Sequence, residues 1–190
     1  GVFLLGVGII IDTLHTKQTF GAGFDEEGDT NANPTLMNVT MYLMLPVFIA
    51  LQCVLAYQIY NGMAGVELLG AVLSSGIFAG IGIIYGHELA HTKGFSFLIA
   101  RWMMALSGSS HFCYAHVYNH HLELGCENDP ATAPRGRSLY AHLPKSYFGQ
   151  SKFLYTMEKQ RLKRLGVPFL SWQNRWIRGY AMSLPTIALF

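Results

Sequence analysis

Two long uncharged runs separated by a short polar break define the first half of the chain. The runs from Leu36 to Tyr60 and from Leu68 to Gly86 contain no charged residue. Each is close to the roughly 20 residues that a helix needs to cross the hydrocarbon core of a bilayer. Asn61-Gly62, a turn signal, stands between them. The pattern therefore predicts a hairpin of two membrane-spanning helices, over about residues 37–60 and 66–86.

Other apolar stretches flank this hairpin. Residues 1–11 are almost wholly apolar and are expected to form the last part of a further spanning helix, followed by a polar loop over residues 13–36. The stretch from Phe95 to Ser107 is apolar but too short to span, so a half-inserted or interfacial position is expected. A last apolar run begins at Trp176.

The composition agrees with a membrane protein. Hydrophobic residues make up 51% of the 190 residues and charged residues only 13%, and the mean hydropathy is +0.28. A typical soluble domain carries about 25% charged residues. The net charge of +2 argues against a nucleic-acid binder that depends on phosphate contacts. The fold class expected is all-α, a polytopic helical bundle whose surroundings are the lipid bilayer.

The distribution of basic residues predicts an orientation. Twelve of the 13 Lys and Arg residues lie between residues 87 and 178. Because basic residues concentrate on the cytoplasmic side of membrane proteins, this region is expected to face the cytoplasm. The chain starts at Gly1 rather than Met and stops inside an apolar run. We therefore expect residues 1–190 to be one partial domain, truncated at both ends.

Histidines supply the candidate chemistry, since six of the eight lie between His87 and His121. In His87-Glu-Leu-Ala-His91 two imidazoles share one face of a helix. His116, His120 and His121 form a second set, in which His116 and His120 share a face and His121 could reach a neighbouring ion. Each motif is expected by chance about 0.01 times in such a chain. Neutral imidazole binds Fe, Zn, Cu and Ni, so the two motifs predict a metal site.

The first motif alone is also typical of zinc proteases, with Glu88 as the general base. A catalytic zinc needs three protein ligands and a water, whereas at least five clustered histidines indicate two metals. A metal transporter or sensor would place its ligands inside the spanning helices, but these lie just beyond helix ends. A membrane metalloprotease remains an alternative, and Glu88 is expected to orient a histidine or form an ion pair.

The remaining polar candidates are expected to have ordinary roles. His15 and His142 have no partner at ligand spacing, so a surface or interfacial position is expected. His111 precedes His116 by five residues, and a structural role is favoured over metal binding. Arg135 and Arg137 are expected to be charges of the cytoplasmic face, with an anionic electron donor as the alternative.

The histidine motifs also carry a resemblance to a known family. The chain resembles the bacterial membrane alkane monooxygenases and xylene monooxygenases, histidine-box di-iron enzymes of the fatty acid desaturase/hydroxylase superfamily. The resemblance covers most of residues 37–178. It is carried by His87 to His91, His111 to His121, Asp129 to Tyr140, Glu158 to Gly166 and Ser171 to Asn174.

The resemblance implies a six-helix protein of the bacterial inner membrane with its histidines facing the cytoplasm. It implies hydroxylation of a methyl group of a hydrophobic substrate by O2, with electrons from rubredoxin or a ferredoxin-type reductase. By position, two iron ions would be bound by His87, His91, His116, His120 and His121. A third histidine box and a further histidine would lie beyond Phe190.

Two departures leave the substrate open. Ala115 stands where alkane enzymes usually have Glu, and Asn119 stands where they tend to have Gly. Ala-His-Val-x-x-His-His is closer to the xylene branch, whereas residues 129–132 point to the alkane branch. A terminal or an aryl methyl group is expected as the target, with fatty acyl desaturation as the alternative within the superfamily.

Overall fold

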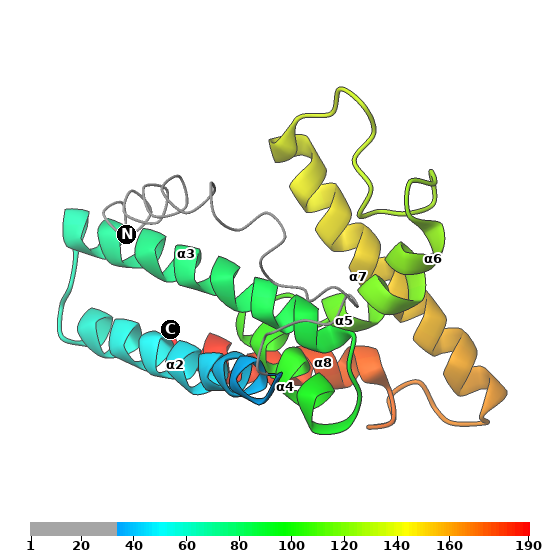
Figure 1. Ribbon diagram of the computed structural model, residues 1–190, viewed down its shortest axis with the longest axis horizontal. Coiled ribbons are helices and arrows are strands. Elements are labelled where there is room, and N and C mark those ends of the chain that lie inside the picture. Colours follow the sequence, from blue (N-terminus) through cyan, green and yellow to red (C-terminus); the bar gives the residue numbers. More distant parts are fainter. Residues whose placement is uncertain (1–33) are drawn as a thin grey trace, which may run out of the picture.

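The computed structural model describes residues 34–190, and this part of the chain contains helices and no strand (Figure 1). The all-α prediction is confirmed. Residues 1–11, His15 and most of the predicted loop lie outside the described residues. The first described helix begins at Pro34 rather than after residue 36. Proline suits a first helical position, because its φ is already helical and its missing N–H would have no partner there.

The predicted hairpin is present as α2 (Pro34–Tyr60) and α3 (Gly65–Ala90) (Figure 1). Segments Asn38–Tyr60 and Gly65–Ala90 are long and apolar enough to cross a membrane. Gly62, with a φ of 90°, allows the tight turn between them. Apolar side chains such as Leu43 and Ile84 are exposed along both helices. This surface suits lipid, in which apolar side chains need no cover from the protein.

A short apolar helix, α4 (Gly94–Leu106), forms the centre of the bundle. It packs against α2, α3 and α8, and Ala100, Met103 and Met104 are fully buried. The half-inserted or interfacial position expected for this stretch stays a prediction, and the structure adds that one face of the helix packs against other helices. Gly86 explains the close packing of α3 on α4, because a Cβ there would lie 3.0 Å from Met104 Cε and 3.3 Å from Met103 Cβ.

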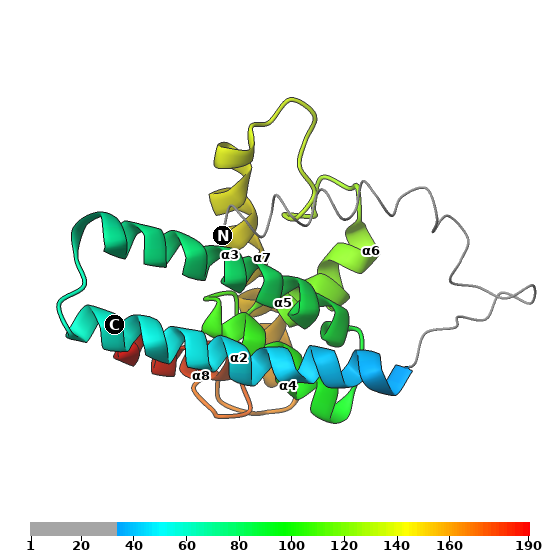
Figure 2. The same cartoon turned by 60° about the vertical axis from the view of Figure 1, so that its left-hand side comes forward.

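Helices α7 (Leu139–Arg164) and α8 (Arg175–Leu189) complete the described fold. Helix α8 lies along α4 and α2, whereas the first turns of α7 project away from the hairpin in both views (Figures 1 and 2). Buried Glu158 joins the two helices. Its carboxylate accepts two hydrogen bonds of 2.7 Å from Arg161 and one of 2.8 Å from the backbone N–H of Arg175.

Candidate metal centre

The first histidine motif lies on the last turns of α3. His87 and His91 are one helical turn apart, and their ring centroids are 5.0 Å apart. The helix continues to Ala90, four residues beyond the predicted end of the span, so the motif is helical as the spacing required. His87 is half-buried and His91 is exposed.

The second motif lies on an irregular helix that faces α3. Helix α5 (Phe112–Ala115) leads into a π-helical segment, η1 (His116–His120), and then into α6 (His121–Glu123). The backbone N–H of His121 donates to the carbonyl oxygen of His116. Such an i to i+5 hydrogen bond widens the helical turn. It brings residue i+5 near residue i in addition to residue i+4, and the rings of both His120 and His121 lie beside that of His116.

This π-helical segment changes which histidines meet. In the regular helix assumed from the sequence, His120 would stack above His116 and His121 would turn away. In the structure, His121 Nε2 lies 2.9 Å from His116 Nε2. His120 instead directs Nδ1 to the carboxylate of Asp129, at 2.7 Å. π-helical segments are frequent at functional sites, and here one selects the neighbours of His116.

All five histidines singled out in the sequence gather in one cluster. One ring nitrogen of each of His87, His91 and His116 lies within 4.8 Å of the others. His116 Nε2 is 3.4 Å from His91 Nε2. The ring of His121 lies 4.8 Å from that of His91, and the ring of His120 lies 5.3 Å from that of His116.

The donor set fits a transition-metal ion. With metal–nitrogen bonds of about 2.1 Å, two nitrogens on adjacent corners of an octahedron lie about 3 Å apart. The nitrogen pairs His91–His116 and His116–His121, at 3.4 and 2.9 Å, are close to this spacing. Burial and the neighbouring histidines lower the pKa of His116 to about 3. His116 is therefore neutral, the protonation state in which imidazole binds a metal.

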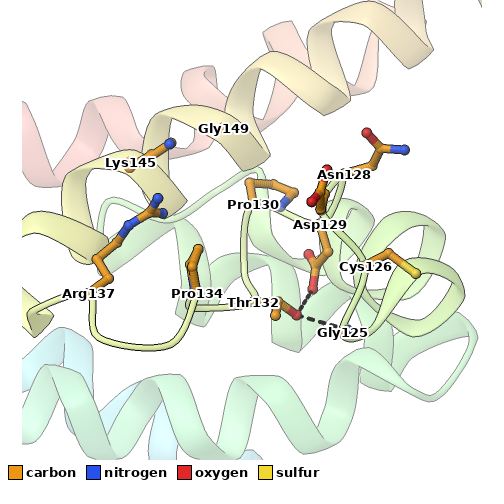
Figure 3. Close-up of a pocket in the computed structure, with 11 residues that line it drawn as sticks. Gly125, Cys126, Asn128, Asp129, Pro130, Thr132, Pro134, Arg137, Lys145 and Gly149 are labelled. Carbon is orange, nitrogen blue, oxygen red and sulfur yellow. Dashed lines mark hydrogen bonds between the residues drawn. The ribbon is translucent and has the colours of Figure 1, made fainter.

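Asp129 is a member of the site that sequence reasoning did not single out. Asp129 is 3% exposed, and its carboxylate interacts with the His120 ring and the backbone N–H of Ala131. It also accepts a hydrogen bond from the Thr132 hydroxyl (Figure 3). Burial alone would raise the pKa of Asp129, but these hydrogen bonds outweigh it and lower the pKa. The sequence signal was Asp129-Pro-Ala-Thr132, in which a carboxylate and a hydroxyl three residues apart can cap one turn.

The other candidates lie apart from the cluster. His111 is buried with its ring 4.6 Å from that of Tyr147, and burial lowers its pKa to about 4. The structural role predicted for it agrees with this position. His142 is half-buried, with Nε2 3.2 Å from the carbonyl oxygen of Ala131, rather than at a free surface. Glu88 is exposed.

Two cavities lie near these residues. One of about 450 Å³ lies between the loop of residues 125–137 and α7, and includes Arg137 and Lys145 in its wall (Figure 3). None of the described residues that line it is a histidine, but Asp129, the partner of His120, is in its wall. A second cavity, of about 420 Å³, reaches His91 and has Phe97 and Tyr118 in its wall.

Comparison with known proteins identifies relatives of the chain. The sequence model of the fatty acid desaturase family matches residues 64–190. Alkane 1-monooxygenase 1 of Alcanivorax borkumensis is 34% identical over 72% of this chain and 34% of its own length. Alkane 1-monooxygenase 1 of Pseudomonas aeruginosa is 29% identical over the whole of this chain and 50% of its own length. The xylene/toluene monooxygenase hydroxylase component XylM of Pseudomonas putida is 28% identical over 70% of this chain and 38% of its own length.

The chain thus spans between a third and a half of the length of these relatives. The family match includes α3 of the hairpin and both histidine motifs, the second of which lies on the π-helical segment. Sequence, helical fold and histidine cluster agree, and the chain belongs to the fatty acid desaturase family.

Proposed function

We propose that residues 1–190 are part of one membrane domain of a non-haem di-iron monooxygenase. The enzyme inserts an oxygen atom from O2 into a C–H bond of a terminal or aryl methyl group. The observation that carries this proposal is the meeting of five histidines from two motifs at one end of an apolar hairpin. The alkane and xylene monooxygenases among the relatives support the choice of reaction.

Two iron ions are the metals proposed for the cluster. His87, His91 and His116 form one set of nitrogens, and His121 and His120 extend it next to His116. When bound, the iron ions would offer coordination positions for O2 and would pass on to it the electrons that a separate donor supplies. The protein holds neutral imidazoles ready for the metal, because the low pKa of His116 removes competition from protons.

The reaction balances with one electron donor. A methyl group, O2, two electrons and two protons give a primary alcohol and water. One oxygen atom enters the C–H bond, and the other leaves as water. We propose rubredoxin or a ferredoxin-type reductase as the donor of the two electrons.

The structure offers a suitable environment for such a substrate. A hydrocarbon has no polar handle, so its binding depends on apolar walls. The cavity that reaches His91 has the aromatic side chains of Phe97 and Tyr118 in its wall, and Lys93 and Arg175 make another part of that wall polar. Side chains of this kind can pack against an alkyl chain or an aromatic ring.

The proposed location is the bacterial inner membrane, with the cluster on the cytoplasmic side. The hairpin carries no Lys or Arg between residues 34 and 90, whereas 12 basic residues follow it. This asymmetry agrees with the excess of basic residues on the cytoplasmic side of membrane proteins. A soluble electron donor would then reach the cluster from the cytoplasm.

Acyl-chain desaturation is the second candidate, and the match to the fatty acid desaturase model favours it. A desaturase would remove two hydrogens from adjacent carbons and reduce O2 to two waters with two further electrons and protons. Membership of the fatty acid desaturase family favours both of these oxidations over the activity of a zinc protease. Glu88, the residue that would be the general base of a protease, is exposed.

The test is product analysis with labelled oxygen. The full-length protein in membranes, supplied with an electron donor and 18O2, is expected to form labelled octanol from octane or labelled methylbenzyl alcohol from xylene. The first product identifies the alkane branch and the second the aromatic branch. A double bond in a supplied acyl lipid, with neither alcohol formed, would establish desaturation instead.

A further inference from the structure

The loop after the second histidine motif is built around one carboxylate. Asp129 Oδ2 lies 2.7 Å from His120 Nδ1 and accepts a hydrogen bond of 2.5 Å from Thr132 Oγ1. Asp129 Oδ1 accepts a hydrogen bond of 2.9 Å from the backbone N–H of Ala131. The Thr132 hydroxyl oxygen also accepts from the N–H of Gly125, at 3.1 Å, which closes the loop (Figure 3). Asp129 is therefore held on several sides.

The contact with Asp129 determines which nitrogen of His120 is free. A neutral imidazole has one N–H donor and one acceptor nitrogen. A carboxylate can only accept, so Nδ1 of His120 carries the hydrogen and donates it to Asp129. The Nε2 atom is then left with its lone pair, as metal coordination requires. Carboxylate partners of this kind commonly orient metal-binding histidines and make them more basic.

Helix α7 holds the loop in place. Gly149 lies where α7 passes Pro130, the residue that follows Asp129, and a Cβ at Gly149 would overlap with the ring of Pro130. His142 Nε2 lies 3.2 Å from the carbonyl oxygen of Ala131, on the other side of Pro130. The loop can therefore sit this close to α7 only with glycine at position 149.

We propose that Asp129 is a positioning residue, which fixes the tautomer and orientation of His120 for metal binding, and that Gly149 allows the loop to present it. The proposal rests on the proposed metal centre and adds a residue to it. Asp129 acts through His120 and does not itself contact the reacting atoms. The contacts Gly149–Pro130 and Asp129–His120 form one path from α7 to the cluster.

The experiment compares variants of the full-length protein in detergent. Iron(II) affinity is measured by competition with a chromogenic chelator, and folding is measured by the thermal midpoint of the metal-free protein. Asp129→Ala is expected to weaken binding at the affected site by about 10–100-fold. Asp129→Asn should weaken it less, because the amide oxygen still accepts from Nδ1 but carries no charge. The iron affinity of Asp129→Glu should also be lower than that of wild type, because the longer side chain displaces the carboxylate.

Gly149→Ala gives an independent test at a distance from the metal. It should weaken iron binding as Asp129→Ala does, because the added methyl group displaces Pro130 from α7 and so disturbs the contact of the neighbouring Asp129 with His120. Asn128→Ala is the control, since Asn128 is an exposed neighbour in the same loop. It should bind iron as wild type does.

The outcomes separate this proposal from the proposed function. Wild-type iron affinity in Asp129→Ala and Asp129→Asn, in a protein that binds iron and hydroxylates substrate, would overturn the positioning role alone. A lower thermal midpoint of the metal-free variants with unchanged iron affinity would show a purely structural role and would also overturn it. A wild-type protein that binds no transition metal would overturn both proposals.

Discussion

At the scale of single residues, His116 is the centre of the cluster. Its Nε2 atom is the one that approaches both His91 and His121, at 3.4 and 2.9 Å. Its ring also stacks on Phe112, with centroids 4.9 Å apart, so its position is fixed by packing as well as by the other histidines. Loss of this side chain would remove the nitrogen atom that lies close to both His91 and His121.

We therefore expect His116→Ala to lose most of the bound iron and to bind the remainder more than about 100-fold more weakly, because both sets of nitrogens share this residue. The measurement is iron per chain after desalting. His111→Phe is the matched control, because it changes a buried histidine five residues away and keeps an aromatic ring against Tyr147. Equal iron content in the two variants would contradict a central role for His116.

Much of the site at this scale could be predicted from spacing alone. The five histidines were identified from two motifs, because repeated imidazoles at one-turn spacing are rare by chance. The partners of His120 and His121 could not be predicted, because they depend on a π-helical hydrogen bond that cannot be predicted from the residue types. Asp129 was missed as a partner of His120 because the loop that returns it to the cluster follows from tertiary packing against α7.

At the scale of elements, the joint between α7 and α8 depends on Glu158. This carboxylate is fully buried, forms two hydrogen bonds with Arg161, and caps the start of α8 through the N–H of Arg175. Burial alone would raise the pKa of Glu158, but the hydrogen bonds from Arg161 and Arg175 outweigh it and lower the pKa. Removing one member of a buried ion pair commonly costs about 3–5 kcal/mol.

Glu158→Gln is therefore expected to lower the free energy of unfolding at pH 7 by about 3 kcal/mol. Because the folded-state pKa is below the unfolded value of about 4.3, this contribution is fully present above that pH. It is lost as the pH falls through the folded-state pKa. Unfolding in detergent should thus show a gap between wild type and variant that narrows in acid.

The control for this prediction is Glu127→Gln, which changes an exposed carboxylate in the loop before α7. Its stability should match wild type at neutral pH. A gap between wild type and Glu158→Gln that stays constant from pH 7 to well below pH 4 would show that the charge of Glu158 does not stabilise the joint.

The helices, like the site, could be predicted in part from the sequence, whereas their ends and their packing could not. The hairpin could be predicted because an uncharged run of spanning length has few other uses in a protein. The end of α3 was placed four residues too early, since His87 was taken as the boundary although the helix continues through the motif. The central position of α4 could not be predicted, because a short apolar stretch suits a bundle core as well as an interface.

At the scale of the whole molecule, an apolar hairpin carries the chemistry at one end. The exposed side chains of α2 and α3 are mostly apolar, whereas the histidines of the cluster and most of the basic residues lie beyond the hairpin or on its last turns. Under the proposed function, a hydrophobic substrate would approach the cluster from the apolar hairpin and a soluble electron donor from the side that carries the basic residues. This division of surfaces suits oxidation of a membrane-soluble compound.

Metal identity and number in the purified full-length protein test the central claim most directly. Elemental analysis with Mössbauer spectroscopy of the 57Fe-enriched protein is expected to find two irons per chain in a coupled pair. The physical reason is that five imidazoles from two motifs exceed what one ion with open positions for O2 can use. A single tightly bound zinc per chain, or a single isolated iron, would contradict the di-iron account.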